Sequence, residues 1–457
     1  MRAPVTALLF ATSVSTVSAA PPTWQPDPSF GNDGATTLTV APGTGDVDTA
    51  SLLVSDQQRR LYTIGQSLSG ENPCLALARL LPDGEIDTSY GDDGHRCLGN
   101  LFEGGGVLYP TDAYVDAGGE LVVAGYDMKF RWPVVCRFDA TGELDIGRFG
   151  SLATPGCQVL DDMAISDSQI PGEPTDAPMH DVTIVPDGDR IRVALNHSSL
   201  AIHLARLTSG GDVVPFGQTS SIELFGDKYN FVSDTLMTDD GRLALAGIIF
   251  LNGSFDFFAA IVDPDSGEVD DEFNNGTPLI FTSTSSHSVS TALTLDAEGH
   301  LVVAGVSAND PDATRPTVAV VTRQGQLLPT FNEGSPMNYD PCMLYVGKCA
   351  IYATAVETLA DGKILLGGYA VQDGYQRAFT MRLGVGGSPD PDYGPDLPGQ
   401  QGYAALADGL PQVATSMLWQ NGKTILAGWR DVSDLNGIDI LVTRLSDGAL
   451  FGDGFEQ

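Results

Sequence analysis

The sequence has little positive charge. Among its 457 residues, 23 are Lys or Arg and 59 are Asp or Glu, which gives a formal net charge of −36. A surface of this sign repels phosphate backbones and anionic lipid headgroups at long range. We therefore expect no nucleic-acid partner. The excess of carboxylates favours either solubility outside the cell or the binding of multivalent cations.

Motifs of catalysis and of metal binding are also absent. There is no Gly-x-Ser-x-Gly elbow, no His-Glu-x-x-His helix and no phosphate-binding glycine loop. The six histidines stand far apart, and no Cys-x-x-Cys pair occurs. We assign no catalytic residue, and the sequence favours a protein that is not an enzyme.

Long apolar runs are missing except at the N-terminus. There, Arg2 precedes an apolar stretch from Val5 to Val17, and small residues follow it, which predicts a signal peptide over Met1–Ala19. The next longest run, Leu243–Leu251, is far shorter than the roughly 20 residues of a membrane helix. We expect a secreted, periplasmic or cell-surface protein without membrane insertion.

What the chain does contain is a repeat. An apolar run, an acidic or glycine turn and a second apolar run, usually ending in a small residue plus glycine, recur at a spacing of about sixty residues. Such a period, holding several short strands, is typical of propeller blades or solenoid turns. The seven copies are Ser51–Gly65, Ala113–Gly125, Asp181–Leu195, Thr235–Gly247, Thr291–Gly305, Thr354–Gly368 and Thr415–Gly428.

A second phrase follows the runs and is clearest over Leu75–Gly94, which ends in Asp-Thr-Ser-Tyr-Gly-Asp-Asp-Gly. Related phrases stand at Asp27–Gly34, Gly142–Gly150 and Gly267–Asn275. The phrase resembles the delta-60 repeat of bacterial secreted and surface proteins. That resemblance extends over almost all of the chain after the signal peptide. It implies a β-propeller-like fold and brings no catalytic residues with it.

The repeat predicts four strands per copy, joined by Asp-Gly turns. We therefore expect an all-β protein: a seven-bladed β-propeller of four-stranded antiparallel blades, formed as one domain by residues 20–457. The strand at Ala35–Val40 should complete the last blade beside Asp439–Leu445, so that pairing of the N- and C-terminal strands closes the ring. An open solenoid is the alternative.

Six cysteines in an exported chain predict three disulfides. Two pairs flank equivalent parts of the repeat, and a third closes a short loop. Because a disulfide needs Cα atoms within about 7 Å, the first two pairs place the strands before and after the phrase in one blade. The expected pairs are Cys74–Cys97, Cys136–Cys157 and Cys342–Cys349.

Charged residues of the phrase have two interpretations. Asp87, Asp92 and Asp93 are weak candidate ligands for Ca²⁺, which prefers hard oxygens, but no copy has the spacing of a twelve-residue calcium loop. Asp and Gly also suit tight turns, so we assign no metal or other cofactor and keep calcium as an alternative. Five arginines at similar repeat positions should pair with acidic turn residues: Arg79, Arg137, Arg206, Arg382 and Arg444.

Antiparallel strands sort the connections onto two faces of the ring. The repeated Asp-Gly turns collect on one, the turn face, and links of varying length collect on the other, the variable face. Because variable loops on a rigid scaffold commonly carry function, the variable face is the candidate ligand-binding face. Its aromatic residues could stack on sugars, anchor a peptide or simply cover loop ends. They are Tyr109, Phe130, Trp132, Tyr345, Tyr375 and Trp429.

The sequence therefore favours a secreted, monomeric binding module at the cell surface, with a protein or a glycan as its partner. One alternative is a propeller hydrolase or lyase acting on extracellular polysaccharide, which would need two carboxylates near a base. Another is a structural surface protein that depends on divalent cations.

Overall fold

The structure is a computed structural model. It describes residues 26–40, 47–69, 72–102, 106–129, 132–151, 154–160, 182–196, 202–216, 218, 221–225, 230–283, 287–309, 313–340, 349–372, 374–394, 402–406, 413–432 and 437–445. The expected signal peptide lies outside these residues, as do Phe130, Cys342 and Tyr345.

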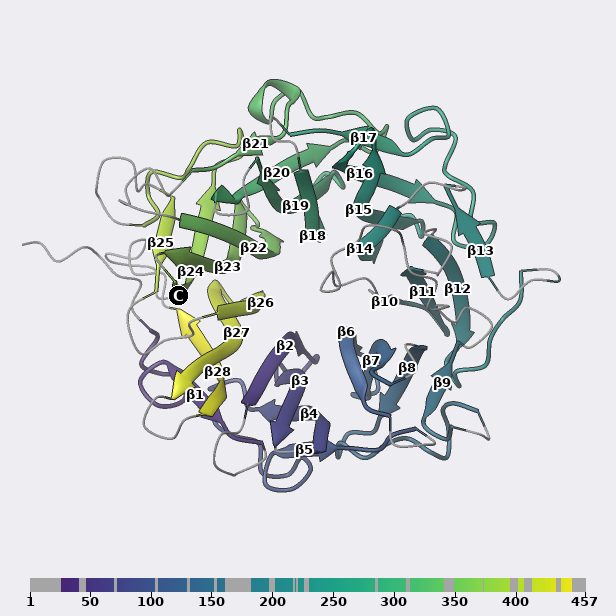
Figure 1. Ribbon diagram of the computed structural model, residues 1–457, viewed down its shortest axis with the longest axis vertical. Coiled ribbons are helices and arrows are strands. Elements are labelled where there is room, and N and C mark those ends of the chain that lie inside the picture. The colour runs from purple at the N-terminus through teal and green to yellow at the C-terminus, as the bar shows by residue number, and fades with distance from the viewer. Residues whose placement is uncertain are drawn as a thin grey trace, which may run out of the picture.

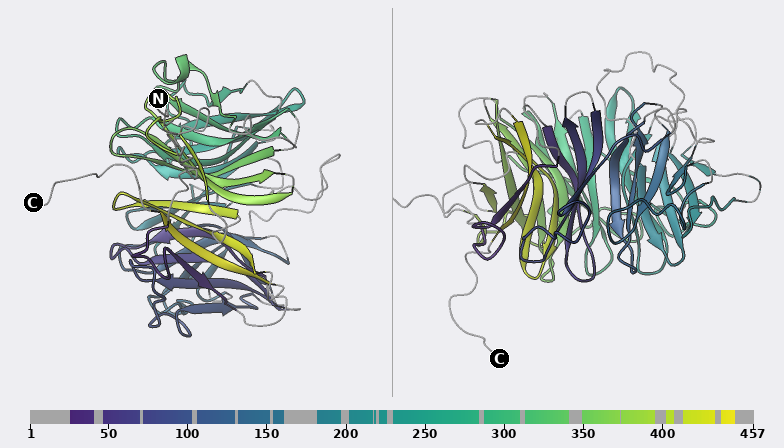
Figure 2. Two further views of the ribbon diagram at one scale, coloured as in Figure 1. Left: turned by 90° about the vertical axis from the view of Figure 1, so that its left-hand side faces the viewer. Right: turned by 90° about the horizontal axis from the view of Figure 1, so that it is seen from below.

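The described chain is all-β and propeller-like, as the sequence predicts. Five sheets contain four antiparallel strands each, and a sixth contains eight strands. The sheets stand side by side around a common axis (Figure 1), and their strands run roughly along that axis (Figure 2). Connections therefore lie on the two faces of the ring.

The four-stranded sheets follow one another along the chain, and within each the order in space is the order in sequence. The first two are β6 (Leu108–Val115), β7 (Leu121–Asp127), β8 (Pro133–Phe138) and β9 (Cys157–Val159), then β10 (Val182–Asp187), β11 (Arg190–Asn196), β12 (Ile202–Thr208) and β13 (Ser221–Leu224). The next two are β14 (Asn230–Met237), β15 (Leu243–Leu251), β16 (Ser254–Val262) and β17 (Leu279–Phe281), then β18 (His287–Leu295), β19 (Leu301–Ala308), β20 (Arg315–Val321) and β21 (Met337–Asn338). A short 3₁₀ helix, η3 (Asn332–Gly334), precedes β21, and the fifth sheet is β22 (Cys349–Thr358), β23 (Ile364–Gln372), β24 (Tyr375–Leu383) and β25 (Tyr403–Ala405).

The eight-stranded sheet joins the two ends of the chain. It contains β2 (Val47–Ser55), β3 (Leu61–Ser69), β4 (Asn72–Leu80) and β5 (His95–Leu98), together with β26 (Val413–Gln420), β27 (Lys423–Val432) and β28 (Gly437–Leu445). The N-terminal strand β1 (Ala35–Leu38) pairs antiparallel with β28. The two halves of this sheet are linked by a single parallel pair, Val47 with Ile438.

The core lies between neighbouring sheets. A strand with one face in water alternates buried and exposed side chains, whereas all six residues of β8 are buried. The reason is that each sheet packs on the sheet before it and the sheet after it. The second and third strands of the sheets are accordingly rich in Val, Leu, Ile and Ala.

The glycine that ends the second run in six of the seven repeats has a steric cause. The first strand bulges, and the carbonyl oxygen of the residue before the bulge points at the second strand. A Cβ atom on Gly125 would lie 1.8 Å from the carbonyl oxygen of Tyr109. A carbonyl oxygen stands 1.8 to 2.1 Å from such a Cβ at all six equivalent glycines: Gly65, Gly125, Gly247, Gly305, Gly368 and Gly428.

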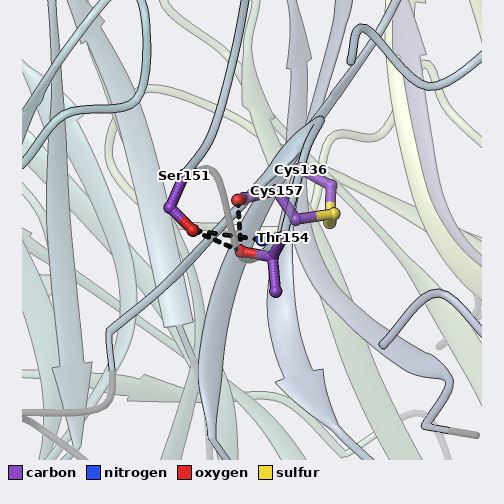
Figure 3. Close-up of a disulfide and its surroundings, with 4 residues drawn as sticks. All are labelled: Cys136, Ser151, Thr154 and Cys157. Carbon is purple, nitrogen blue, oxygen red and sulfur yellow. Dashed lines mark hydrogen bonds between the residues drawn. A yellow bond between two sulfur atoms is a disulfide. The ribbon is translucent and has the colours of Figure 1, made fainter. Parts of the chain in front are cut away.

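Two of the expected disulfides are present. Cys74 pairs with Cys97 between β4 and β5, and Cys136 with Cys157 between β8 and β9, with Cα–Cα distances of 5.4 and 4.0 Å. Beside the second bridge, the Thr154 hydroxyl donates to the Cys157 carbonyl at 2.9 Å (Figure 3).

The third expected disulfide falls partly outside the described residues. Cys349 is disulfide-bonded, and Cys342, its expected partner, lies beyond the described chain. The two bridges seen in full suggest an extracellular or otherwise oxidising compartment.

Candidate functional site

On the turn face, the acidic residues of the repeated phrase form ion pairs with arginines. Arg79 Nε lies 2.7 Å from Asp87 Oδ2, and the guanidinium sits over the Tyr90 ring of the same phrase. In five units, the guanidinium carbon lies between 4.2 and 5.1 Å from such a ring centroid. The expected pairing of arginines with acidic turn residues is confirmed, and the other pairs are Arg137–Asp145, Arg206–Asp265, Arg382–Asp390 and Arg444–Asp27.

Two of the three candidate calcium ligands, Asp87 and Asp92, have partners of their own, and Asp93 is exposed in the turn. Burial alone would raise the pKa of Asp87, but hydrogen bonds from Ser89 and Arg79 outweigh it and hold the pKa below its usual value. Asp92 pairs with Arg96 at 2.9 Å. Within the described ranges, no three His, Cys, Asp or Glu side chains gather closely enough to hold a metal. Calcium binding stays a prediction, and the geometry gives the phrase a structural role.

The described candidate aromatic residues are spread over three sheets. Tyr109 in β6 is half-buried and stacks on Tyr126 with a centroid distance of 5.0 Å. Trp429 in β27 is half-buried between its strand partners in β26 and β28. Trp132 is half-buried just before β8. Tyr375, at the start of β24, is 77% exposed and lines a pocket.

The Tyr375 pocket, of about 270 Å³, lies at the hairpin between β23 and β24 on the variable face. The four strands of the sheet, β22 to β25, present side chains of one sheet face to it. Gln372 is the cross-strand partner of Tyr375, and Ala370 is the partner of Arg377. Among the described residues, the lining is Cys349, Ala370, Gln372, Tyr375, Arg377, Tyr403 and Ala405.

The neighbouring sheet fixes the inner edge of this pocket. Arg315, at the start of β20, donates from Nη1 to the carbonyl oxygen of Cys349 at 2.9 Å. Its Nε lies 2.7 Å from Asp340 Oδ1. On the far side, the ring of Tyr403 stacks on Phe379 with a centroid distance of 5.5 Å. The pocket is therefore held by packed or ion-paired groups.

The described lining of this pocket offers groups that can contact a ligand. Its lining offers an exposed aromatic ring, a guanidinium and an amide, over a floor that includes two alanines. Hydrolysis of a glycosidic bond requires an acid and a base, and the described lining residues include neither a carboxylate nor a histidine. Sequence reasoning missed Arg377 and Gln372. The signal was available, because residues two apart on a strand share a face and Tyr375-x-Arg377 follows an Asp-Gly turn.

A second pocket, of about 310 Å³, lies on the turn face between the turns after β2 and β6. Its two carboxylates are engaged within their own turns. Asp56 accepts from Arg60 Nε at 2.6 Å, and Asp116 accepts from the backbone nitrogens of Gly118 and Glu120. This arrangement stabilises the turns, so the Tyr375 pocket is the better candidate site.

The comparisons with known proteins agree with the fold. A family model described as "Domain of unknown function (DUF5122) beta-propeller" matches residues 59–90 and 359–393. The first segment begins in the turn before β3 and ends at Tyr90, and the second begins in the turn before β23 and ends at Tyr393. Tyr90 and Tyr393 are the aromatic residues of the repeated phrase. The match supports a β-propeller repeat family. No curated protein matches the sequence.

Solved structures with similar folds have very different sequences. Virginiamycin B lyase from Staphylococcus aureus is 9% identical with a TM-score of 0.46, covering 90% of this chain and 98% of that one. YCF48 bound to D1 peptide is 10% identical with a TM-score of 0.44, covering 93% and 99%. Endo-arabinase from Bacteroides thetaiotaomicron is 12% identical with a TM-score of 0.34, covering 61% and 97%.

Within the described residues, no helix is long and apolar enough to cross a membrane.

Proposed function

We propose that this protein is a seven-bladed propeller, closed by its two ends, that binds a ligand outside the cell on its variable face. The eight-stranded sheet then comprises two blades, β2–β5 and β26–β28 with β1, touching through the one pair of Val47 and Ile438. The buried core of the described chain divides into seven clusters, each shared by two successive blades. Seven blades need seven such interfaces in a ring and six in an open array.

The contact between the last and first blades, here called the terminal seam, supports closure. The backbone nitrogen of Leu53 donates to Ser416 Oγ across it at 3.1 Å. Equivalent bonds join consecutive blades elsewhere, from Ile184 to Asp112 Oδ2 at 2.7 Å and from Leu293 to Asp234 Oδ2 at 2.8 Å. The terminal seam thus uses the same type of bond as the contacts within the chain.

The Tyr375 pocket is the observation that carries the binding role. A large aromatic side chain that is 77% exposed contributes little to the fold but offers a flat apolar face to a ligand. It stands beside polar groups that can orient what binds there. The disulfides, which suggest an oxidising compartment, support a ligand among extracellular molecules.

Binding of the intact protein to arrays of glycans and peptides tests this proposal. We expect a ligand whose binding is lost in Tyr375→Ala and kept in Ile146→Ala, because Ile146 is similarly exposed, at 68%, on the turn face. Binding that both variants retain would place the site elsewhere. Robust turnover of a bound polysaccharide would contradict the non-enzymatic role and favour the hydrolase or lyase.

A further inference from the structure

We infer that the Tyr375 pocket takes one carboxylate-bearing sugar ring of an otherwise uncharged glycan. This inference rests on the proposed binding function and names its ligand class. It depends on the placement of Tyr375, Arg377 and Gln372 around a shallow space and on the contrast between local and overall charge.

The spacing of the side chains suits a single ring. Tyr375 and Arg377 point from the same face of β24, roughly 7 Å apart along the strand. A pyranose stacked on the Tyr375 ring would therefore carry a substituent on its edge towards the guanidinium. A carboxylate is the group that Arg binds best, through two parallel hydrogen bonds.

Small residues leave the room that such a ring needs. Opposite Arg377 stands Ala370, whose side chain ends at Cβ, and Ala405 borders the same space from β25. The volume of about 270 Å³ is below the range of roughly 300 to 1,000 Å³ that is typical of sites enclosing drug-sized ligands. One sugar unit fits this size, with the rest of the glycan outside.

The amide of Gln372 favours a sugar over a peptide terminus. It lies directly across from Tyr375 and can both donate and accept, as the hydroxyl groups of a sugar require. A peptide ending in a free carboxylate could use Arg377 and the Gln372 amide as well, but its extended backbone has no ring face to stack on Tyr375. We therefore infer a sugar, and the experiment below also tests whether a peptide binds.

Charge limits the ligand to an isolated acid. The described groups at the pocket edge include two guanidiniums, Arg377 and Arg315, and one carboxylate, Asp340. The whole chain, in contrast, carries a formal charge of −36. A polyuronate would be repelled at long range, most strongly at low salt where the screening length exceeds 10 Å. One carboxylate on a neutral chain meets mainly the local guanidiniums.

Calorimetric titration of the intact protein can test this with two matched probes. The first is a neutral trisaccharide that ends in glucuronate, and the second is the same trisaccharide ending in glucose. We expect the acidic probe to bind about tenfold more tightly or better, which corresponds to a hydrogen bond to a charged group. Polygalacturonate should bind poorly at low salt and improve as salt is added.

Variants separate the parts of the site. Arg377→Gln should abolish the preference for the acidic probe, and Arg377→Lys should restore part of it because the charge returns without the planar fork. Tyr375→Ala should weaken both probes alike. Arg59→Gln, an exposed arginine in a turn on the opposite face, is the matched control and should change nothing.

If the two probes bind with equal affinity, and Arg377→Gln changes neither affinity, the inference is overturned. The proposed function would survive that result if Tyr375→Ala still weakened the binding of both probes. Failure of the acidic probe to bind at millimolar concentration would also overturn it. If a peptide with a free C-terminus binds and the same peptide with an amidated C-terminus does not, the ligand class is a peptide and not a sugar. If no ligand on the arrays responds to Tyr375→Ala, the proposed function itself fails.

Discussion

Thr415 Oγ1 donates a hydrogen bond to the carbonyl oxygen of Ala50 at 2.8 Å, across 365 positions of the sequence. Both residues lie at the bulges of first strands, Thr415 in β26 and Ala50 in β2. The same bond joins Thr354 to Ala414 at 3.0 Å, and Thr291 to Ala353 at 2.9 Å, between blades that follow one another in the chain. The bulge of one blade is thus hydrogen-bonded to the bulge of the next, at the terminal seam as elsewhere.

Replacement of Thr415 by Val should measure how tightly the terminal seam is closed. The substitution removes the donor and leaves the Ala50 carbonyl without this partner, so we expect a loss of about 0.5 to 1.5 kcal/mol in the free energy of unfolding. Thr354→Val, which breaks the same bond inside the chain, is the control. Urea unfolding of both variants gives the comparison. A closed ring predicts similar losses, and a neutral Thr415→Val beside a costly Thr354→Val would mean that the seam is open.

Gly125→Ala should destabilise the protein strongly. The added Cβ would meet the carbonyl oxygen of Tyr109 at 1.8 Å, and that oxygen is part of a strand and cannot move freely. Overpacking of this kind typically costs about 1 to 3 kcal/mol. A thermal melt with Gly147→Ala as the control checks it, because a Cβ on Gly147 meets no atom within 4 Å. Equal melting temperatures for the two variants would show that the bulge can relax.

The propeller-like fold was predictable because the residues of its repeated phrase contact one another within a short stretch of sequence. Asp87, Tyr90 and Arg79 come together within one phrase and its strand, so their spacing alone indicates a turn. The disulfide pairs followed from the equivalence of two copies. The bonds between blades were not predictable, because they join bulges about sixty residues apart or at opposite ends of the chain.

The candidate site was predictable only in part. Tyr375 was among the expected aromatic residues, but nothing in the sequence distinguished it from Tyr109 and Trp429, which are half-buried. Exposure depends on how neighbouring sheets pack, and that is a tertiary property. Arg377 was missed although its two-residue spacing from Tyr375 places both on one face of a strand, whereas the pairing of Gln372 with Tyr375 requires the register of the β23–β24 hairpin.

Mild reduction should open the Cys74–Cys97 bridge before the Cys136–Cys157 bridge. Cys97 is exposed at the rim of its blade, whereas Cys136 and Cys157 are 0% and 1% exposed, and a thiolate reductant must reach a sulfur atom. Alkylation followed by mass mapping, with increasing dithiothreitol, gives the order. Unfolded protein serves as the control, since both bridges should then react alike. Labelling of Cys136 first would show that its blade opens locally.

Glu357 in β22 should make the stability of the protein depend on pH. Burial raises the pKa of its carboxyl from an ordinary value of 4.5 to about 7, although a hydrogen bond from the backbone of Trp419, in the next blade, acts in the opposite direction. The folded state therefore holds a proton that the unfolded chain releases at lower pH. This contribution to stability is complete below about pH 4.5 and is lost as the pH rises to about 7.

Glu357→Gln should remove this dependence, because the amide keeps an oxygen that can accept from Trp419 and has no proton to lose. We expect the variant to gain stability relative to the natural protein as the pH is raised from 5 to 8, measured by urea unfolding at each pH. Glu272→Gln is the matched control, since the Glu272 side chain is exposed and its replacement should leave the pH profile unchanged. The difference in the free energy of unfolding between Glu357→Gln and the natural protein could instead stay constant from pH 5 to 8. That result would show that the pKa of Glu357 is not raised in the folded state, and that water reaches the boundary between these two blades.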